Sequence, residues 1–432
     1  MKIKKLHSVF ALFLVFCLMI ASLASCATRS PDADKNEVPS KGYGDYDGDV
    51  PGDVAAGDVD LVSPGAPDSF GGSGIGGIVG QQTEIEYRPG VLTGSEWRDN
   101  DHWEFFLSRL NAQDNGWYDI AARWSMCAAH RLHVRLTADG SPVSLAGVVL
   151  YGENDAVLWR AVSDNKGNAY LFWNLAPSTQ SDVPARVEVT DTKGQTTTVS
   201  GKTFTDAVAA GTLEVSLPSA AGKVPTGIDL MFTIDTTGSM ADELEYLKAE
   251  LEDVIGRVSA QSQLPVRTAL NFYRDEGDEY VVRYFAFSDV DTALANLRAQ
   301  SADGGGDYPE AVHTALANGI NLDHGWNDSH IKIMILVLDA PPHENPEVIR
   351  SLSETIAKAA ERGIRIIPVA SSGVNTTCQV LFRTYAALTG GTYTFLTDHS
   401  GVGEPHEMPD VEEIHVELLN DMLVRIIVGY CE

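Results

Sequence analysis

Continuous apolar runs alternate with helical stretches from residue 228 to the C-terminus, and this alternation constrains the fold more than any other feature. The expected strands are residues 228–235, 266–274, 280–287, 331–339, 364–371 and 392–396. The expected helices begin at Ala241, Val290, Pro309 and Glu347, with two more near Leu381 and at the C-terminus. Strands that are apolar throughout are typical of parallel sheets covered on both faces. The pattern therefore predicts a doubly wound, Rossmann-like α/β domain over residues 224–432.

Residues 130–218 have a different pattern, in which apolar and polar residues alternate in short runs. Asp139-Gly140 and Lys166-Gly167 mark tight turns between these runs. Short strands with regular turns predict a small β-sandwich, so the chain is expected to be multidomain. The run from Asp139 to Gly167 resembles the carboxypeptidase regulatory-like or bacterial Ig-like modules. This resemblance implies a spacer or presentation domain.

An aromatic stripe lies in residues 85–129, ahead of the expected β-sandwich. Trp97, Trp103, Phe106, Leu107 and Leu110 recur there at near-helical spacing behind an acidic start. This spacing predicts a short helical segment whose aromatic face packs on the next module.

The N-terminus has the pattern of an export signal. A lysine-rich start is followed by an apolar run from Val9 to Leu23 and then by small residues up to Cys26. A bilayer core requires roughly 20 apolar residues, so the run predicts a cleaved signal peptide over residues 1–25 rather than a permanent helix. The order Leu-Ala-Ser-Cys that ends at Cys26 resembles the bacterial lipobox. It implies lipid on Cys26 and anchoring to the extracytoplasmic side of the cell membrane, with an ordinary signal peptide as the alternative.

The stretch that follows is acidic and rich in small residues. Residues 26–84 are dominated by Gly, Asp, Pro and Ser and have no apolar period. Such a segment cannot offset its chain entropy by burial, so a disordered acidic tether is expected. The formal net charge of −29 also argues against nucleic acid as a partner, because binding a phosphate backbone requires clustered Lys and Arg.

The number of cysteines permits one disulfide in the mature chain. If Cys17 is removed with the signal and Cys26 carries lipid, only Cys127, Cys378 and Cys431 remain. Cys378 and Cys431 both fall in the C-terminal domain and would pair in an oxidising compartment. The equally open alternative is that all three stay reduced.

Three loops rich in oxygen donors follow expected strands or precede an expected helix. They are residues 235–239, with the sequence Asp-Thr-Thr-Gly-Ser, residues 304–307, with Gly-Gly-Gly-Asp, and Asp339. We expect these loops to lie together, because the carboxyl ends of parallel strands meet at one edge of a sheet. Hydroxyl and carboxylate oxygens suit Mg²⁺, Mn²⁺ or Ca²⁺.

The pattern Asp235-x-Thr237-x-Ser239 resembles the metal-ion-dependent adhesion site of von Willebrand factor A domains, and the resemblance extends from about residue 226 to the C-terminus. It implies that the Thr237 and Ser239 hydroxyls bind the metal. It also implies that Asp235 and Asp339 act on the ion directly or through water.

Asp307 departs from the family pattern, because it would stand where integrin-type domains place a threonine. An extra carboxylate would reduce the residual positive charge of the ion, and so weaken the capture of an acidic partner residue or close the coordination shell. The resemblance otherwise implies Mg²⁺, with Mn²⁺ or Ca²⁺ as alternatives, and a protein partner whose acidic residue completes the metal shell. It implies no enzymatic activity.

The same residues also have purely structural interpretations. Ser239 has the position of a helix cap, and Asp307 with Glu310 has the spacing of a capping box. The acidic stretch 273–280 has the pattern of a hairpin turn with a solvated face, and His343 that of a turn residue. The presence of all three loops in order favours the metal site.

Two other functions compete with the binding module. Asp-x-Thr-Gly-Ser after an apolar strand also resembles the phosphorylated loop of haloacid-dehalogenase-like phosphohydrolases, in which Asp235 would be the nucleophile and Mg²⁺ would assist. Against this, Thr236 occupies the position where ion pumps have lysine, and no second Asp follows at plus two. The third possibility is a structural envelope protein in which the cation merely stabilises the domain.

Overall fold

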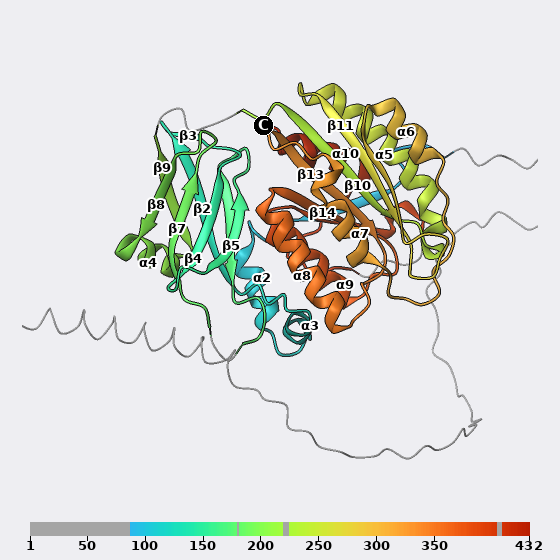
Figure 1. Ribbon diagram of the computed structural model, residues 1–432. Coiled ribbons are helices and arrows are strands. Elements are labelled where there is room, and N and C mark those ends of the chain that lie inside the picture. The colour runs from blue at the N-terminus through green and yellow to red at the C-terminus, as the bar shows by residue number, and fades with distance from the viewer. Residues whose placement is uncertain (1–86, 179–180, 219–223, 404–407) are drawn as a thin grey trace, which may run out of the picture. The chain divides into compact units, whose positions relative to one another are not determined.

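The computed structural model describes residues 87–178, 181–218, 224–403 and 408–432, which belong to one compact unit from Tyr87 to Glu432 (Figure 1). The expected signal peptide 1–25, the lipid site Cys26 and the expected tether 26–84 lie outside these residues. Within the described part, no helix is both long and apolar enough to cross a membrane.

The larger sheet has eight strands. Their spatial order is β12 (Val282–Ser288), β11 (Val266–Tyr273), β10 (Gly227–Asp235), β13 (His330–Leu338), β14 (Ile364–Ala370), β15 (Tyr393–Leu396), β1 (Thr93–Trp97) and β16 (Glu417–Leu418). The run from β11 to β15 is parallel throughout, while β12 and β1 pair antiparallel with their neighbours. The loops after β10, β11, β13 and β14 therefore emerge at the same edge of the sheet. The expected α/β architecture is confirmed for this part of the chain.

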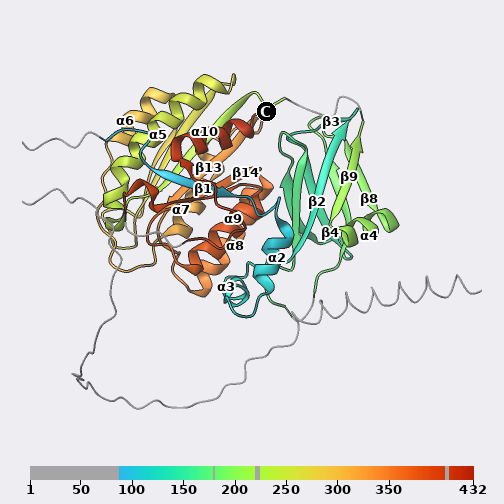
Figure 2. The ribbon, with the colours of Figure 1, turned by 180° about the vertical axis from the view of Figure 1, so that it is seen from behind.

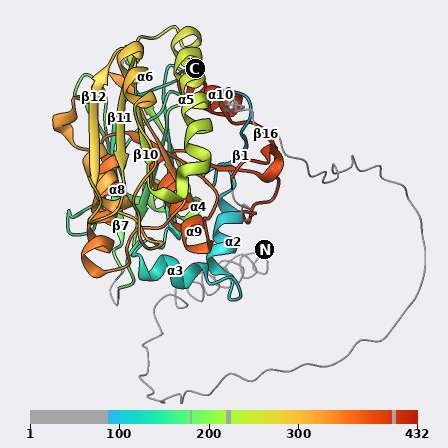
Figure 3. The ribbon, with the colours of Figure 1, turned by 90° about the vertical axis from the view of Figure 1, so that its right-hand side faces the viewer.

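Helices cover both faces of the larger sheet (Figures 1 and 3). One layer consists of α5 (Ala241–Gln261), α6 (Val290–Arg298) and α10 (Leu419–Gly429), and the other of α7 (Val312–Gly319), α8 (Pro346–Glu361) and α9 (Thr376–Thr389). Side chains of β10 alternate between the layers: Leu230 and Phe232 pack towards α5 and α10, whereas Met231 packs towards α7 to α9. Every residue of β10 and β13 is buried, which explains why these strands are apolar without alternation.

Strand β1 adds a segment from far upstream to the larger sheet (Figure 2). It pairs with β15 on one side and with β16 on the other. The helices α2 (Trp103–Asn111) and α3 (Trp117–Arg123) follow it. The expectation of a purely helical segment over residues 85–129 is therefore wrong for β1. Its sequence, Thr-Gly-Ser-Glu-Trp, has no strand-like apolar pattern, and a Cβ at Gly94 would lie 2.9 Å from the Phe395 carbonyl oxygen.

A buried glutamate on α5 holds the chain that leads into β1. The Glu250 carboxylate is fully buried and accepts hydrogen bonds from the backbone N–H groups of Gly90 (2.8 Å), Val91 (2.8 Å) and Leu92 (3.0 Å). These three donors directly precede the strand. Glu250 thus fixes the entry of β1 into the sheet.

A buried ion pair fixes the other end of β1. Arg383 of α9 donates from Nε to Asp99 Oδ2 at 3.0 Å, and Trp97 Nε1 donates to Asp99 Oδ1 at 3.0 Å. The Arg383 and Asp99 side chains are 0% and 1% exposed. Removing either partner would leave a buried charge without compensation, so this pair ties β1 to α9.

Residues 130–217 form two four-stranded sheets where they are described (Figure 1). One contains β3 (Ser141–Pro142), β2 (His130–Ala138), β6 (Asn168–Trp173) and β9 (Thr212–Leu217), and the other β5 (Val157–Val162), β4 (Gly147–Gly152), β7 (Pro184–Thr190) and β8 (Thr196–Ser200). Helix α4 (Gly201–Ala210), which the alternating pattern does not predict, connects β8 to β9. This part of the chain contacts the α/β domain, since Asn165 Nδ2 donates to the carbonyl of Gly429 at the end of α10 (3.2 Å) and Val162 packs against Gly363, between α8 and β14.

The suggested disulfide between Cys378 and Cys431 is not formed. Cys378 is buried in the first turn of α9, where its Sγ lies 3.5 Å from the Tyr308 hydroxyl. The Cys431 Sγ instead donates to the Ile427 carbonyl at 3.2 Å, beyond the end of α10. The two thiols therefore engage different parts of the domain.

We expect Glu250→Gln to lower the free energy of unfolding by about 1–3 kcal/mol, because the amide cannot replace the carboxylate as acceptor for all three N–H groups. Urea denaturation of the full chain measures this loss. Glu252→Gln, at a partly exposed position on α5 where the side chain pairs with Arg298, is the matched control and should cost less than about 1 kcal/mol. Equal losses in the two variants would contradict the role assigned to Glu250.

Candidate functional site

The loop after β10 gathers a carboxylate and two hydroxyls. Asp235 is fully buried, and its Oδ1 accepts hydrogen bonds from Thr237 N (2.9 Å) and Thr237 Oγ1 (2.7 Å). The exposed Ser239 hydroxyl lies 3.2 Å from Thr237 Oγ1. Asp235 Oδ2 has no hydrogen-bond partner of good geometry among the described residues, although the buried Tyr273 hydroxyl lies near enough to lower the pKa of Asp235. Three of the expected site residues therefore lie together.

Backbone hydrogen bonds join the three expected loops. Asp303 N donates to the Thr236 carbonyl at 3.0 Å, and Gly238 N donates to the Gly304 carbonyl at 3.1 Å. At the other end of the same loop, Glu310 N donates to the Pro341 carbonyl at 3.0 Å. The glycine-rich loop thus bridges the loop after β10 to the loop that begins at Asp339.

Asp339 acts electrostatically on Asp235. It is 5% exposed and follows directly after β13, the strand beside β10. Burial, followed by the charge of Asp339, raises the pKa of Asp235 to about 7, while hydrogen bonds from Thr237 act in the opposite direction. Asp339 therefore joins the group formed by Asp235, Thr237 and Ser239.

Among the described residues, Glu310 is a further acid that lies close to Thr237, and the expected role of Asp307 stays a prediction. Asp307 is exposed, whereas Glu310 is 3% exposed. A Cβ at Gly305 would lie 3.1 Å from Glu310 Oε1 and 3.3 Å from the Thr237 Cβ, so Glu310 and Thr237 line the same point. Burial and then the charges of nearby aspartates, Asp235 first, raise the pKa of Glu310 to about 9.

The capping box that the spacing of Asp307 and Glu310 suggests is not formed. Helix α7 begins at Val312 with Ala311 as its N-cap, and no side chain caps it. The Glu310 carboxylate is therefore available to the site instead. The sequence carries no signal for this placement, because the burial of Glu310 depends on its pairing with the loop after Asp339.

The acidic stretch 273–280 also packs at this edge rather than forming a fully solvated turn. Asp275 is 7% exposed and its Oδ1 lies 2.8 Å from His343 Nε2. The Asp278 carboxylate accepts hydrogen bonds from Asp275 N (3.0 Å) and Gly305 N (2.9 Å). The acidic stretch therefore supports the glycine-rich loop.

Among the described residues, the buried Arg274 beside these acids donates to backbone carbonyls. These carbonyls belong to Thr236 (3.1 Å) and Ser301 (3.0 Å). Glu310 Oε2 and Asp235 Oδ2 are both buried without a hydrogen-bond partner of good geometry among the described residues. A buried carboxylate without a hydrogen-bond partner is stabilised by a proton or by a cation.

The donor set fits a hard divalent cation. Within the described ranges, no three His, Cys, Asp or Glu side chains group closely enough to form a metal site by themselves. A site here depends on the Thr237 and Ser239 hydroxyls, with carboxylates acting directly or through water. Such mixed oxygen sets are those that Mg²⁺, Mn²⁺ and Ca²⁺ accept.

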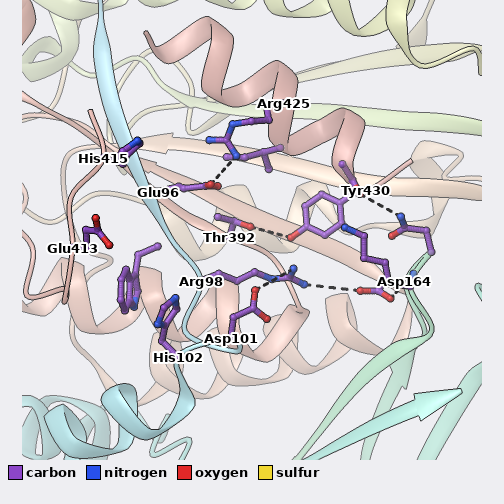
Figure 4. A pocket seen from close by; sticks show the side chains of 15 residues that line it. Glu96, Arg98, Asp101, His102, Asp164, Thr392, Glu413, His415, Arg425 and Tyr430 are labelled. Carbon is purple, nitrogen blue, oxygen red and sulfur yellow. Dashed lines mark hydrogen bonds and ion pairs between the residues drawn. The ribbon is translucent and has the colours of Figure 1, made fainter. Parts of the chain in front are cut away.

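A separate pocket of about 630 Å³ lies beside β1, α10 and the turn at residues 164–166 (Figure 4). Arg425 pairs with Glu96 at 2.7 Å, and Arg98 lies 3.6 Å from Asp101 and 3.9 Å from Asp164. Both arginines that line this pocket are thus paired with acids. The carboxylates gathered around Thr237 do not line the pocket. The pocket is therefore distinct from the candidate site.

The fold and these loops define an α/β domain with an oxygen-lined face at the carboxyl ends of its strands. Residues 229–402 match the family described as von Willebrand factor A domain, a stretch that includes Asp235, Thr237, Ser239, Glu310 and Asp339. The chain therefore contains a von Willebrand factor A domain. Domains of this family commonly mediate protein–protein interaction.

One similar protein is a putative ariadne-like RING finger protein of Acanthamoeba polyphaga mimivirus, which is 33% identical over 117 residues. The similarity covers 27% of this chain and 11% of that protein. The chain thus spans a small part of the relative's length, and the likeness is local.

We expect the metal-free chain to lose stability as pH rises from about 5 to about 9 in EDTA. Over this range the folded protein retains protons on Asp235 and Glu310 that the unfolded chain has lost, because both folded pKa values are raised. The unfolded state therefore binds fewer protons, and the free energy of unfolding falls with pH. Urea denaturation of the native chain and Glu310→Gln measures this; the variant should show a shallower fall, and identical slopes would contradict the assignment.

Proposed function

We propose that the chain is an exported, lipid-anchored protein whose von Willebrand factor A domain binds a divalent cation and, through it, a protein partner. The observation that carries this proposal is the pair of buried carboxylate oxygens, Asp235 Oδ2 and Glu310 Oε2, that have no hydrogen-bond partner of good geometry among the described residues. Both acids lie close to Thr237, on the face where ligands of open α/β sheets bind.

The cation would be held by the Thr237 and Ser239 hydroxyls, with Asp235 and Asp339 acting directly or through water. Mg²⁺ suits this set best, with Mn²⁺ or Ca²⁺ as alternatives. When bound, the ion supplies an electrophilic centre to which a partner's oxygen donor coordinates. Because Ser239 is exposed while Asp235 is fully buried, the hydroxyl side of the group is the side open to a partner.

A phosphohydrolase is disfavoured by the same geometry. Asp235 is 0% exposed, and its Oδ1 is occupied by two hydrogen bonds from Thr237, which leaves a nucleophile little access to a substrate. The Thr236 hydroxyl donates to the Tyr273 carbonyl (2.9 Å) and is hydrogen-bonded to the Tyr280 hydroxyl (2.8 Å). We therefore propose a binding module without enzymatic activity.

The flanking segments suit display of this domain away from a membrane. Lipid on Cys26 would provide the anchor and residues 26–84 the tether. The sheets of residues 130–217 would act as a spacer that contacts the binding domain, as Asn165 does at Gly429.

Asp235→Ala should abolish saturable Mg²⁺ binding by the full chain, because it removes the acid that orients Thr237. Isothermal titration measures the binding, with Asp307→Ala as the matched acidic control that should bind as the native chain does. The proposal would be contradicted if the native chain bound none of Mg²⁺, Mn²⁺ and Ca²⁺. Cation-dependent stabilisation without any cation-dependent protein ligand would instead favour the structural role.

Cys26→Ser should move the protein from the membrane fraction to the soluble fraction of the producing bacterium. Mass spectrometry of the native chain should find a lipid-modified N-terminal Cys26, as expected for a lipobox. An unmodified Cys26 would remove the proposed anchor while leaving the metal site untouched.

A further inference from the structure

Glu310 is held firmly at the cation site by its backbone. Its N–H donates to the Pro341 carbonyl at 3.0 Å, and residue 310 forms a parallel bridge with Pro342 in the loop that follows Asp339. Its carboxylate lies against Gly305 together with Thr237, and the residue is 3% exposed. A rigid backbone thus presents a third acid beside Asp235 and Asp339.

The charges at this point do not balance when a divalent ion is added. A bound ion displaces the protons that these buried acids hold, and three carboxylates then carry one more negative charge than the ion neutralises. Asp278 adds an acid to the same loop, because its carboxylate accepts from Gly305 N and Asp275 N, and Asp275 contacts His343. A site with two acids would be neutral when loaded, whereas this one stays negative.

We infer that Glu310 is a third acidic group of the cation site, so that the loaded site excludes an acidic partner residue and takes a neutral oxygen donor instead. This inference rests on the proposed cation binding. It replaces the acidic partner residue that the family resemblance implies.

Exposed acids around the site agree with this inference. They are Glu276, Asp303 and Asp307. A like-charged rim slows the approach of an acidic surface and favours a basic one.

The test uses the full chain, Mn²⁺ as the metal probe and acetate as the mimic of an acidic side chain. Isothermal titration gives the Mn²⁺ affinity, and water-proton relaxation reports whether acetate displaces water from bound Mn²⁺. Glu310→Gln keeps the shape and removes the charge, while Asp307→Asn is the matched control. Thermal melts in EDTA verify that both variants fold.

We expect Glu310→Gln to weaken Mn²⁺ binding by at least about tenfold and Asp307→Asn by less than about twofold. Excess acetate should displace water from Mn²⁺ in Glu310→Gln but not in the native chain. Native affinity in Glu310→Gln, or acetate entry in the native chain, would overturn the inference while the proposed cation site stands. A native chain that binds no Mn²⁺ would overturn both.

Discussion

Convergence of parallel strands on one edge of the sheet is the constraint on which the site depends. The loops after β10 and β13 meet there, and the glycine-rich loop joins them through backbone hydrogen bonds at Asp303, Gly238 and Glu310. This framework buries the carboxylates of Asp235, Asp339 and Glu310 close together. Burial of that kind costs free energy unless protons or a cation neutralise the acids.

The same sheet depends on a segment from the start of the described chain. Glu250 and the Asp99–Arg383 pair hold β1 in place, so residues far upstream complete the sheet of the von Willebrand factor A domain. The two smaller sheets follow α2 and α3 along the chain and return against the same domain at Asn165 and Val162. The candidate binding face and the smaller sheets are therefore parts of one packed unit.

Sequence reasoning succeeded where the signal is local. Buried strands such as β10 are apolar throughout, and Asp235, Thr237, Ser239 and Asp339 lie at or just after strand ends, so their placement could be predicted. Glu310 could not, because its position depends on pairing with Pro341 in another loop. Strand β1 was missed for a related reason, since its five residues lack an apolar pattern and its partners β15 and β16 lie at the other end of the chain.

Cation binding at this face is tested most directly by a crystal structure of the full chain grown with Mn²⁺, with the ion located by its anomalous scattering. We expect a peak within about 2.2 Å of the Thr237 and Ser239 hydroxyl oxygens, with Asp235 and Asp339 beside it. No peak at this position, in crystals that contain Mn²⁺, would contradict cation binding there.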